Sequence, residues 1–226
     1  MEWRSHAAER HLAAAISPDV RAEDRPTNPR DGAGRGGPDE LALLARGALL
    51  ALLAVWTFRF ITHPLNFSVI NRSFLHLVNL PFHEAGHIFL APFGSFLMSL
   101  GGSLTQVLVP VVCAIAFVRK PDLFGAAVAT WWAGQNLVDL GPYIADARAL
   151  QMPLLGGATG AEVEGHDWEA ILQTLGWLHL DRRLGMVAHV LGSITMVAAV
   201  AGGAWIAWSD YRNSNNQTFP RTTPYS

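Results

Sequence analysis

The sequence predicts an all-α polytopic membrane protein, a helix bundle of about five spans with an interfacial helix and a disordered N-terminal tail. Half of its 226 residues are apolar and only 15% are charged, against roughly 25% in an ordinary soluble domain. The charges are unevenly placed, since residues 41–118 contain only Arg46, Arg59, Arg72 and Glu84. Several apolar runs also approach the roughly 20 residues that a helix needs to cross a bilayer.

The polar ends of the chain are expected to lie outside the membrane domain. Residues 1–40 are rich in glycine, proline and charge, a composition that cannot order a backbone by burial. We therefore expect a disordered polar leader there. It does not read as a signal peptide, because the first apolar run starts only at Leu41. Residues 209–226 are expected to form a polar tail.

The membrane domain is predicted to cover residues 41–208. Residues 145–183 are more polar, and Ile171, Leu172 and Leu175 follow helical spacing there, which predicts an interfacial helix. The lipid bilayer is an expected partner, and the expected location is multi-pass in a bacterial inner membrane. The net charge of −2 argues against nucleic acid as a partner. The five expected spans are 41–61, 67–90, 103–118, 123–144 and 184–208.

The segment His-Glu-Ala-Gly-His at 83–87 carries the clearest chemistry. His83 and His87 are four residues apart, so on a helix their imidazoles project from one face and can bind one Zn²⁺. Glu84 sits beside them, where it can act as general base on a water. Ionisable side chains in an apolar segment are costly and are candidates for function. The alternative is a set of polar groups hydrogen-bonded inside a bundle.

A third zinc ligand must come from elsewhere, because catalytic zinc usually has three protein ligands and an open position. Asp139 and Asp146 are the candidates. We expect Gly141-Pro142 to break the helix, which would free Asp146 to reach the histidines and leave Asp139 inside the helix. The alternatives are a surface ion pair between Asp146 and Arg148, and an Asp139 that is a satisfied polar group within the membrane.

Other polar residues have simpler interpretations. Asp167 precedes a helical pattern and is predicted to be its N-cap. His166 is expected to face solvent in a loop, with a place at the mouth of the active site or a role as a metal ligand as the alternatives. His76, His189 and Gln106 are predicted to be polar packing residues, or to line a water path to the metal.

The motif residues resemble those of a known family. The His-Glu-Ala-Gly-His at 83–87, the Gly101-Gly102-Ser103 that opens a later segment, and Asn136 followed by an aspartate after a proline are similar to site-2-protease-like intramembrane zinc metalloproteases. The resemblance covers residues 66–148. It implies His83, His87 and Asp146 as zinc ligands, Glu84 as the residue that activates water, and Asn136 as a substrate-positioning amide.

The expected activity is therefore zinc-dependent endopeptidase cleavage, inside the bilayer, of a membrane protein or peptide substrate. Two alternatives remain. The chain could be a metal transporter whose transit site contains the two histidines and the two aspartates, or an inactive protease-like scaffold that binds membrane proteins. A glutamate placed as a base beside the ligands favours the enzyme, since a transit site needs only ligands.

Overall fold

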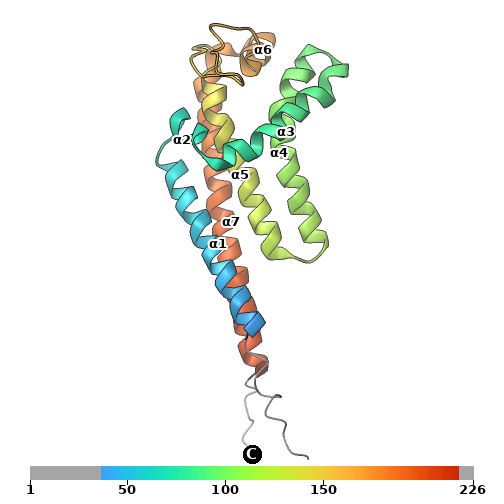
Figure 1. Cartoon of the computed structure of the whole chain (residues 1–226), viewed down its shortest axis with the longest axis vertical. Helices are drawn as coiled ribbons and strands as arrows, with labels where there is room; N and C mark the ends of the chain where they lie inside the picture. Colours follow the sequence, from blue (N-terminus) through green and yellow to red (C-terminus); the bar gives the residue numbers. More distant parts are fainter. Residues whose placement is uncertain (1–36, 219–226) are drawn as a thin grey trace, which may run out of the picture. The chain divides into compact units, whose positions relative to one another are not determined.

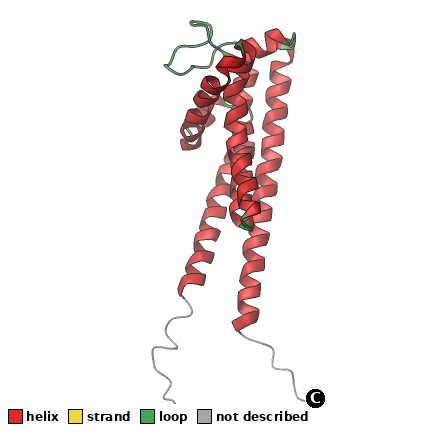
Figure 2. Cartoon of the chain, turned by 90° about the vertical axis from the view of Figure 1, so that its right-hand side faces the viewer, coloured by secondary structure: helices red, strands yellow, loops and turns green. Residues whose placement is uncertain are grey.

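The computed structural model describes residues 37–218 and divides the chain into two units, Met1–Leu41 and Ala42–Ser226. The predicted disorder of residues 1–36 falls outside the described residues and stays a prediction. The last four leader residues, 37–40, are instead helical and begin the first helix of the fold. Within 37–218 the chain forms helices and no strand (Figure 2), which confirms the all-α class. The elements are α1 (Gly37–Ile61), α2 (Phe67–Asn71), α3 (Phe74–Leu90), η2 (Ala91–Phe93), α4 (Ser95–Arg119), α5 (Leu123–Ala145), α6 (Asp167–Thr174), η3 (Leu178–Leu180) and α7 (Asp181–Thr218).

Local capping sets several helix starts. The side chains of Asn66, Ser73 and Asp122 each accept a hydrogen bond from a backbone N–H in the first turn of α2, α3 and α5 respectively. Because Ser73 starts a new helix, the expected continuous span 67–90 is two helices. Gly94 adopts a φ of 102° after η2, a conformation that glycine tolerates without strain, and the chain turns there from α3 into α4.

Among residues 37–218, three helical segments are long and apolar enough to cross a membrane: Glu40–Ile61, Ser95–Arg119 and Leu178–Asn213. They contain the first, third and fifth expected spans, although α4 begins eight residues before residue 103 and α7 runs through much of the expected tail. The five expected crossings are thus represented by three candidates. At 17 residues, α3 is only about 25 Å long, which is shorter than a hydrocarbon core of about 30 Å.

Helix α5 is long enough to cross a membrane but is not apolar enough to count as a candidate span. It carries Gln135, Asn136 and Asp139, which lower its hydropathy, and all three side chains are buried. It lies between α4 and α7 (Figure 1) and packs against both. A central helix is covered by its neighbours, so it needs no continuous apolar surface.

Close backbone contacts and one buried cluster hold α5 in place. A Cβ on Gly134 would lie 2.8 Å from the Gly192 carbonyl oxygen of α7, so these two helices approach through small residues, as helices in membranes commonly do. Trp131 of α5 donates a 2.7 Å hydrogen bond to Thr57 of α1. The buried apolar cluster joins α1, α2, α5 and α7 through Leu53, Phe60, Ile70, Trp131, Val138, Met196 and Ala199.

The expected helix break at Gly141-Pro142 is wrong, because α5 continues through both residues to Ala145. Pro142 lies in the last turn, where the missing N–H costs the helix a single hydrogen bond. Gly141 packs against α7, and a Cβ there would lie 3.1 Å from the Gly185 carbonyl oxygen. The helix therefore continues, packed against its neighbour, through the point where the sequence suggested a break.

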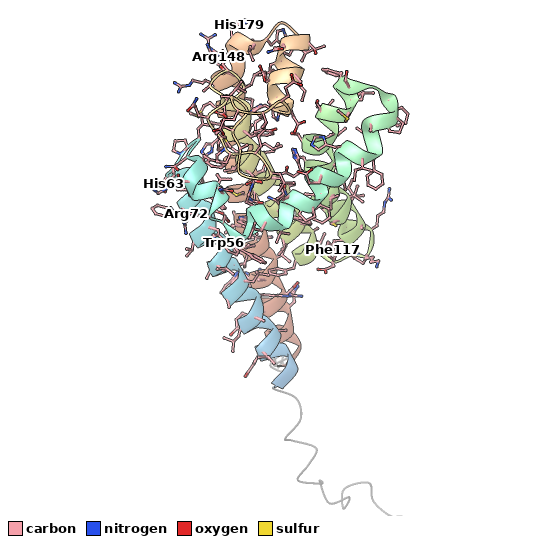
Figure 3. All side chains as sticks on the ribbon, turned by 45° about the horizontal axis from the view of Figure 1, so that its top comes forward. Trp56, His63, Arg72, Phe117, Arg148 and His179 are labelled. Carbon is pink, nitrogen blue, oxygen red and sulfur yellow. The ribbon has the colours of Figure 1, made fainter. Side chains whose placement is uncertain are left out.

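The long connection between α5 and α6 gathers at the end of the bundle where α7 begins. Arg148 donates two hydrogen bonds to Asp181, at 2.8 and 2.7 Å. Figure 3 shows the labelled Arg148 and His179 at this same end, with Phe117 of α4 well away from it. The ion pair fastens the start of the connection to the start of α7.

Candidate metal centre

Three side chains from two distant parts of the chain converge at one point. His83 and His87 project from α3, and Asp167 is the first residue of α6. The Oδ2 atom of Asp167 lies 3.2 Å from His83 Nε2 and 3.3 Å from His87 Nε2. The three potential ligand atoms all lie within 4.8 Å of one another, so one cation could contact all of them.

The hydrogen-bond partners of the two Nδ1 atoms determine the tautomer of each histidine. His83 Nδ1 lies 2.9 Å from Gln106 Oε1, and His87 Nδ1 lies 2.8 Å from the Met98 carbonyl oxygen. Both partners are acceptors, so each Nδ1 carries a hydrogen. In the neutral ring the Nε2 atom then offers a bare lone pair, and both lone pairs face the Asp167 carboxylate. Electron-rich atoms at this separation require a positive charge between them, from protons or from a metal.

Two of the three separations between ligand atoms match those expected around a tetrahedral zinc ion. Ligands held at 2.0–2.1 Å around a tetrahedral Zn²⁺ lie about 3.3–3.4 Å apart, and the two distances to Asp167 Oδ2 are 3.2 and 3.3 Å. Two histidines and one carboxylate form a ligand set that catalytic zinc uses, with a fourth position left open. The three ligand atoms lie within 4.8 Å of one another, so these residues could together hold a metal ion.

Gly102 of α4 forms the floor of this centre. A Cβ at this position would lie 2.5 Å from His83 Nε2 and 2.6 Å from His87 Nε2. Those distances are far below ordinary van der Waals contact, so any side chain here would collide with both ligand atoms. The absence of a side chain leaves the space in which the two nitrogens meet Asp167.

Hydrogen bonds from the bundle hold Asp167 in position. The Tyr143 hydroxyl donates to Asp167 Oδ2 at 3.0 Å and accepts the Asp167 backbone N–H at 3.0 Å. The next residue, Trp168, donates to Ser103 Oγ of α4 at 3.0 Å. Burial opposes ionisation of Asp167, but hydrogen bonds that the two histidines donate when their Nε2 atoms are protonated outweigh it and lower its pKa to about 2. The carboxylate is thus charged at any physiological pH.

The structure does not bring Asp146 to the two histidines. It is the C-cap residue of α5, and its carboxylate accepts the backbone N–H groups of Gln151 at 3.1 Å and Met152 at 2.8 Å. It also lies 3.6 Å from His166 Nε2. These contacts fix the connection that leads to Asp167, which replaces Asp146 in the candidate ligand set. The alternative ion pair with Arg148 is not formed either, since Arg148 binds Asp181.

His166 is the N-cap of α6, because its Nδ1 accepts the Glu169 backbone N–H at 3.2 Å. The prediction that Asp167 caps this helix is therefore wrong. The His166 side chain is buried, and burial lowers its pKa. Its ring centroid lies 4.4 Å from that of Tyr143. The cap frees Asp167, one residue later, to project towards α3.

Asn136 and Asp139 are both buried on α5. The Asn136 amide donates to the Trp132 carbonyl oxygen of its own helix at 2.9 Å, and its side chain is fully covered, so in this arrangement it cannot touch a substrate. Asp139 accepts hydrogen bonds from His76 at 3.0 Å, Asn79 at 3.1 Å and Gln106 at 2.9 Å. This matches the interpretation of Asp139 as a satisfied polar group.

A cavity of about 100 Å³ adjoins the metal centre, large enough for several water molecules. His83, Glu84 and Tyr143 contribute polar groups to its wall. Much of the rest is apolar, and part of that apolar wall comes from the connection between α5 and α6. The lining residues are Phe67, Ile70, His76, Leu80, His83, Glu84, Gln106, Asp139, Leu140, Tyr143, Met152, Pro153, Leu154 and Leu155.

Sequence reasoning placed the two histidines and missed Asp167 as their partner. A signal was present in the chain, since His166, Asp167 and Trp168 form a dense polar and aromatic cluster, but helix capping explained Asp167 equally well. No protein-family model, curated protein or solved structure matches the chain. The case for function therefore rests on the site.

Proposed function

We propose that the protein is a zinc-dependent intramembrane endopeptidase of the site-2-protease-like type. The observation that carries the proposal is the convergence of His83, His87 and Asp167 beside a cavity that Glu84 also lines. The proposal includes a multi-pass arrangement in a bacterial inner membrane, with α3 and α5 added to the three candidate spans. It assigns the third ligand to Asp167 in place of Asp146.

The site residues divide the chemistry between them. His83, His87 and Asp167 would hold the zinc, which supplies a Lewis acid for the scissile carbonyl and lowers the pKa of water. Glu84 takes a proton from the attacking water as the water oxygen bonds to the carbonyl carbon. It returns that proton to the leaving nitrogen as the C–N bond breaks, so the products are a carboxylic acid and an amine. Tyr143 keeps Asp167 oriented throughout.

The proposed substrate class is a segment of a membrane protein. Leu140, Leu154 and Leu155 contribute to a largely apolar wall, which suits apolar side chains from a transmembrane segment. A cavity of about 100 Å³ has room for one or two side chains and not for an intact helix of about 10 Å diameter. The substrate is therefore expected to bind in a locally unwound form.

The test compares the full chain, purified in detergent, with its Glu84→Gln variant. We expect about one zinc per chain in both proteins, because Glu84 is not a ligand, and loss of cleavage only in the variant. Cleavage is measured by mass spectrometry as new peptide termini in a solubilised membrane proteome. Glu162→Gln, a change in an exposed carboxylate of the α5–α6 connection, is the matched control and should retain both properties.

Three outcomes would contradict the proposal. A wild-type chain without zinc would remove the metal centre, and termini that persist in Glu84→Gln would remove Glu84 as the base. The absence of any Glu84-dependent terminus, together with zinc flux into reconstituted vesicles, would indicate a transporter.

A further inference from the structure

A chain of buried side chains runs from the middle of α5 to the back of a zinc ligand. Asp139 Oδ2 accepts a 2.9 Å hydrogen bond from Gln106 Nε2, and Gln106 Oε1 lies 2.9 Å from His83 Nδ1. Gln106 and Asp139 are only 4% and 6% exposed, so both lie in the interior of the protein. The three residues come from α5, α4 and α3 and cross the interior of the bundle.

The direction of each hydrogen bond follows from Asp139, the residue at one end of this series of side chains. An ionised carboxylate can only accept hydrogen bonds, so Asp139 must face the NH₂ group of Gln106. The carbonyl oxygen of that amide then faces His83. An acceptor there requires a hydrogen on His83 Nδ1, which leaves the Nε2 lone pair for the metal.

A second amide, that of Asn79, also holds the Asp139 carboxylate. The indole N–H of Trp132, which can only donate, bonds Asn79 Oδ1 at 2.9 Å. The Asn79 NH₂ group must therefore point the other way, and it donates to Asp139 at 3.1 Å. His76 adds a further contact to the same carboxylate, with its Nδ1 atom 3.0 Å from Oδ1. Together these contacts keep Asp139 in a single orientation.

We propose that Gln106 and Asp139 are positioning residues for the metal centre: Asp139 fixes the orientation of the Gln106 amide, and the amide fixes His83 in the form that ligates through Nε2. The inference rests on the metal centre of the proposed function and not on the peptidase reaction. Partners of this kind typically change metal affinity by 10- to 100-fold when they are removed.

The first test exchanges Gln106 for two residues of similar size. Gln106→Met removes the acceptor for His83 Nδ1–H, and we expect zinc affinity to fall 10- to 100-fold. Gln106→Glu keeps an acceptor at the same place, and we expect zinc affinity within a few-fold of the wild type. If Gln106 only fills space, the order is reversed, because methionine packs well in a core whereas a second buried carboxylate beside Asp139 is costly.

The measurement uses the full chain in detergent and a chelator that competes for zinc. Gln135→Met is the matched control, since Gln135 is a fully buried glutamine that bonds Asn79 and does not contact His83, and its zinc affinity should be unchanged. Nitrogen NMR of ¹⁵N-histidine in the metal-free protein gives a second readout. The His83 Nδ1–H signal, assigned by its loss in His83→Gln, should persist in Gln106→Glu and weaken in Gln106→Met.

The second test asks whether Asp139 acts through Gln106. Asp139→Asn replaces one acceptor with an NH₂ group and should lower zinc affinity by less than Gln106→Met does. The double variant should then bind zinc no more weakly than Gln106→Met alone, because the effects of residues in one network are not additive. Additive losses, or no loss in Asp139→Asn, would overturn the role of Asp139. Wild-type zinc affinity in Gln106→Met would overturn the proposal, whatever the result for peptide cleavage.

Discussion

Replacing Gly102 with alanine tests the metal centre with the smallest possible change. The new methyl carbon would lie 2.5 Å from His83 Nε2, 2.6 Å from His87 Nε2 and 2.7 Å from His83 Cδ2. Ordinary contacts of a Cβ begin near 3.4 Å, so the overlap approaches 1 Å with two separate rings. Each ring would have to move away from the point where the ligand atoms meet.

The rings have little freedom to move. Turning His83 away breaks or lengthens its 2.9 Å contact with Gln106, and turning His87 away does the same to its 2.8 Å contact with Met98. A lost hydrogen bond costs about 0.5–1.5 kcal/mol, and overpacking costs about 1–3 kcal/mol. A penalty of about 1–3 kcal/mol on the metal-bound arrangement corresponds to zinc binding weaker by about 5- to 150-fold.

The assay is a zinc competition titration on the full chain, with thermal unfolding measured in parallel. Alanine favours a helix over glycine by about 1 kcal/mol, so Gly102→Ala should fold while it binds zinc poorly. Gly47→Ala in α1 is the control, because no atom beyond the adjoining backbone of its own helix lies within 4 Å of the place that its methyl group would take, and it should bind zinc normally. Wild-type zinc affinity in Gly102→Ala would refute the argument that the two Nε2 atoms meet over this glycine.

Two further predictions concern the carboxylates and the pH dependence of the site. Asp167→Asn should weaken zinc binding at least about 100-fold, which is more than the typical effect of a residue that only supports a ligand. Asp146→Asn should chiefly lower the unfolding temperature, because it loosens the loop that Asp146 caps. The reverse order of zinc affinities would return the role of third ligand to Asp146. Zinc affinity should also fall as the pH is lowered from roughly 7 to 5, because ligating histidines must be neutral. Asp167 does not contribute to this pH dependence, because its pKa is lowered to about 2. Its stabilising effect is fully present above the ordinary aspartate pKa and is lost only as the pH falls through about 2. A flat zinc affinity over that range, measured by the same competition titration, would exclude histidine ligands.

The part of the site that lies within one helical turn could be predicted from the sequence. His83 and His87 share a face because the helix repeats every 3.6 residues, and Glu84 follows from the same spacing. Asp167 could not be predicted this way, because it is 80 residues away from His87 along the chain. Its position depends on how α6 docks on α4, through contacts such as that between Trp168 and Ser103.

The fold shows the same division between local and tertiary causes. The apolar segments of the sequence predicted where helices lie. An apolar surface is needed where a helix contacts lipid, whereas α5 packs against other helices of the protein. Likewise, Pro142 has a strong local tendency to end a helix, and the packing of Gly141 against α7 overrides it. In each case the sequence contained the local preference and the neighbouring helix decided the outcome.

The contact between Gly86 and Gly101 has a consequence for how the zinc ligands are prepared. Each glycine sits against the other's carbonyl group, with no room for a side chain on either. Sliding α3 along α4 by one helical turn would bring Phe82 or Leu90, each four residues from Gly86, opposite Gly101. A Cβ would then strike the backbone. The two helices therefore have one permitted register. That register sets the height of both histidines relative to Gly102, Gln106 and the Met98 carbonyl, so the entropy of arranging these ligands is lost when the helices pack and need not be lost again when a metal binds.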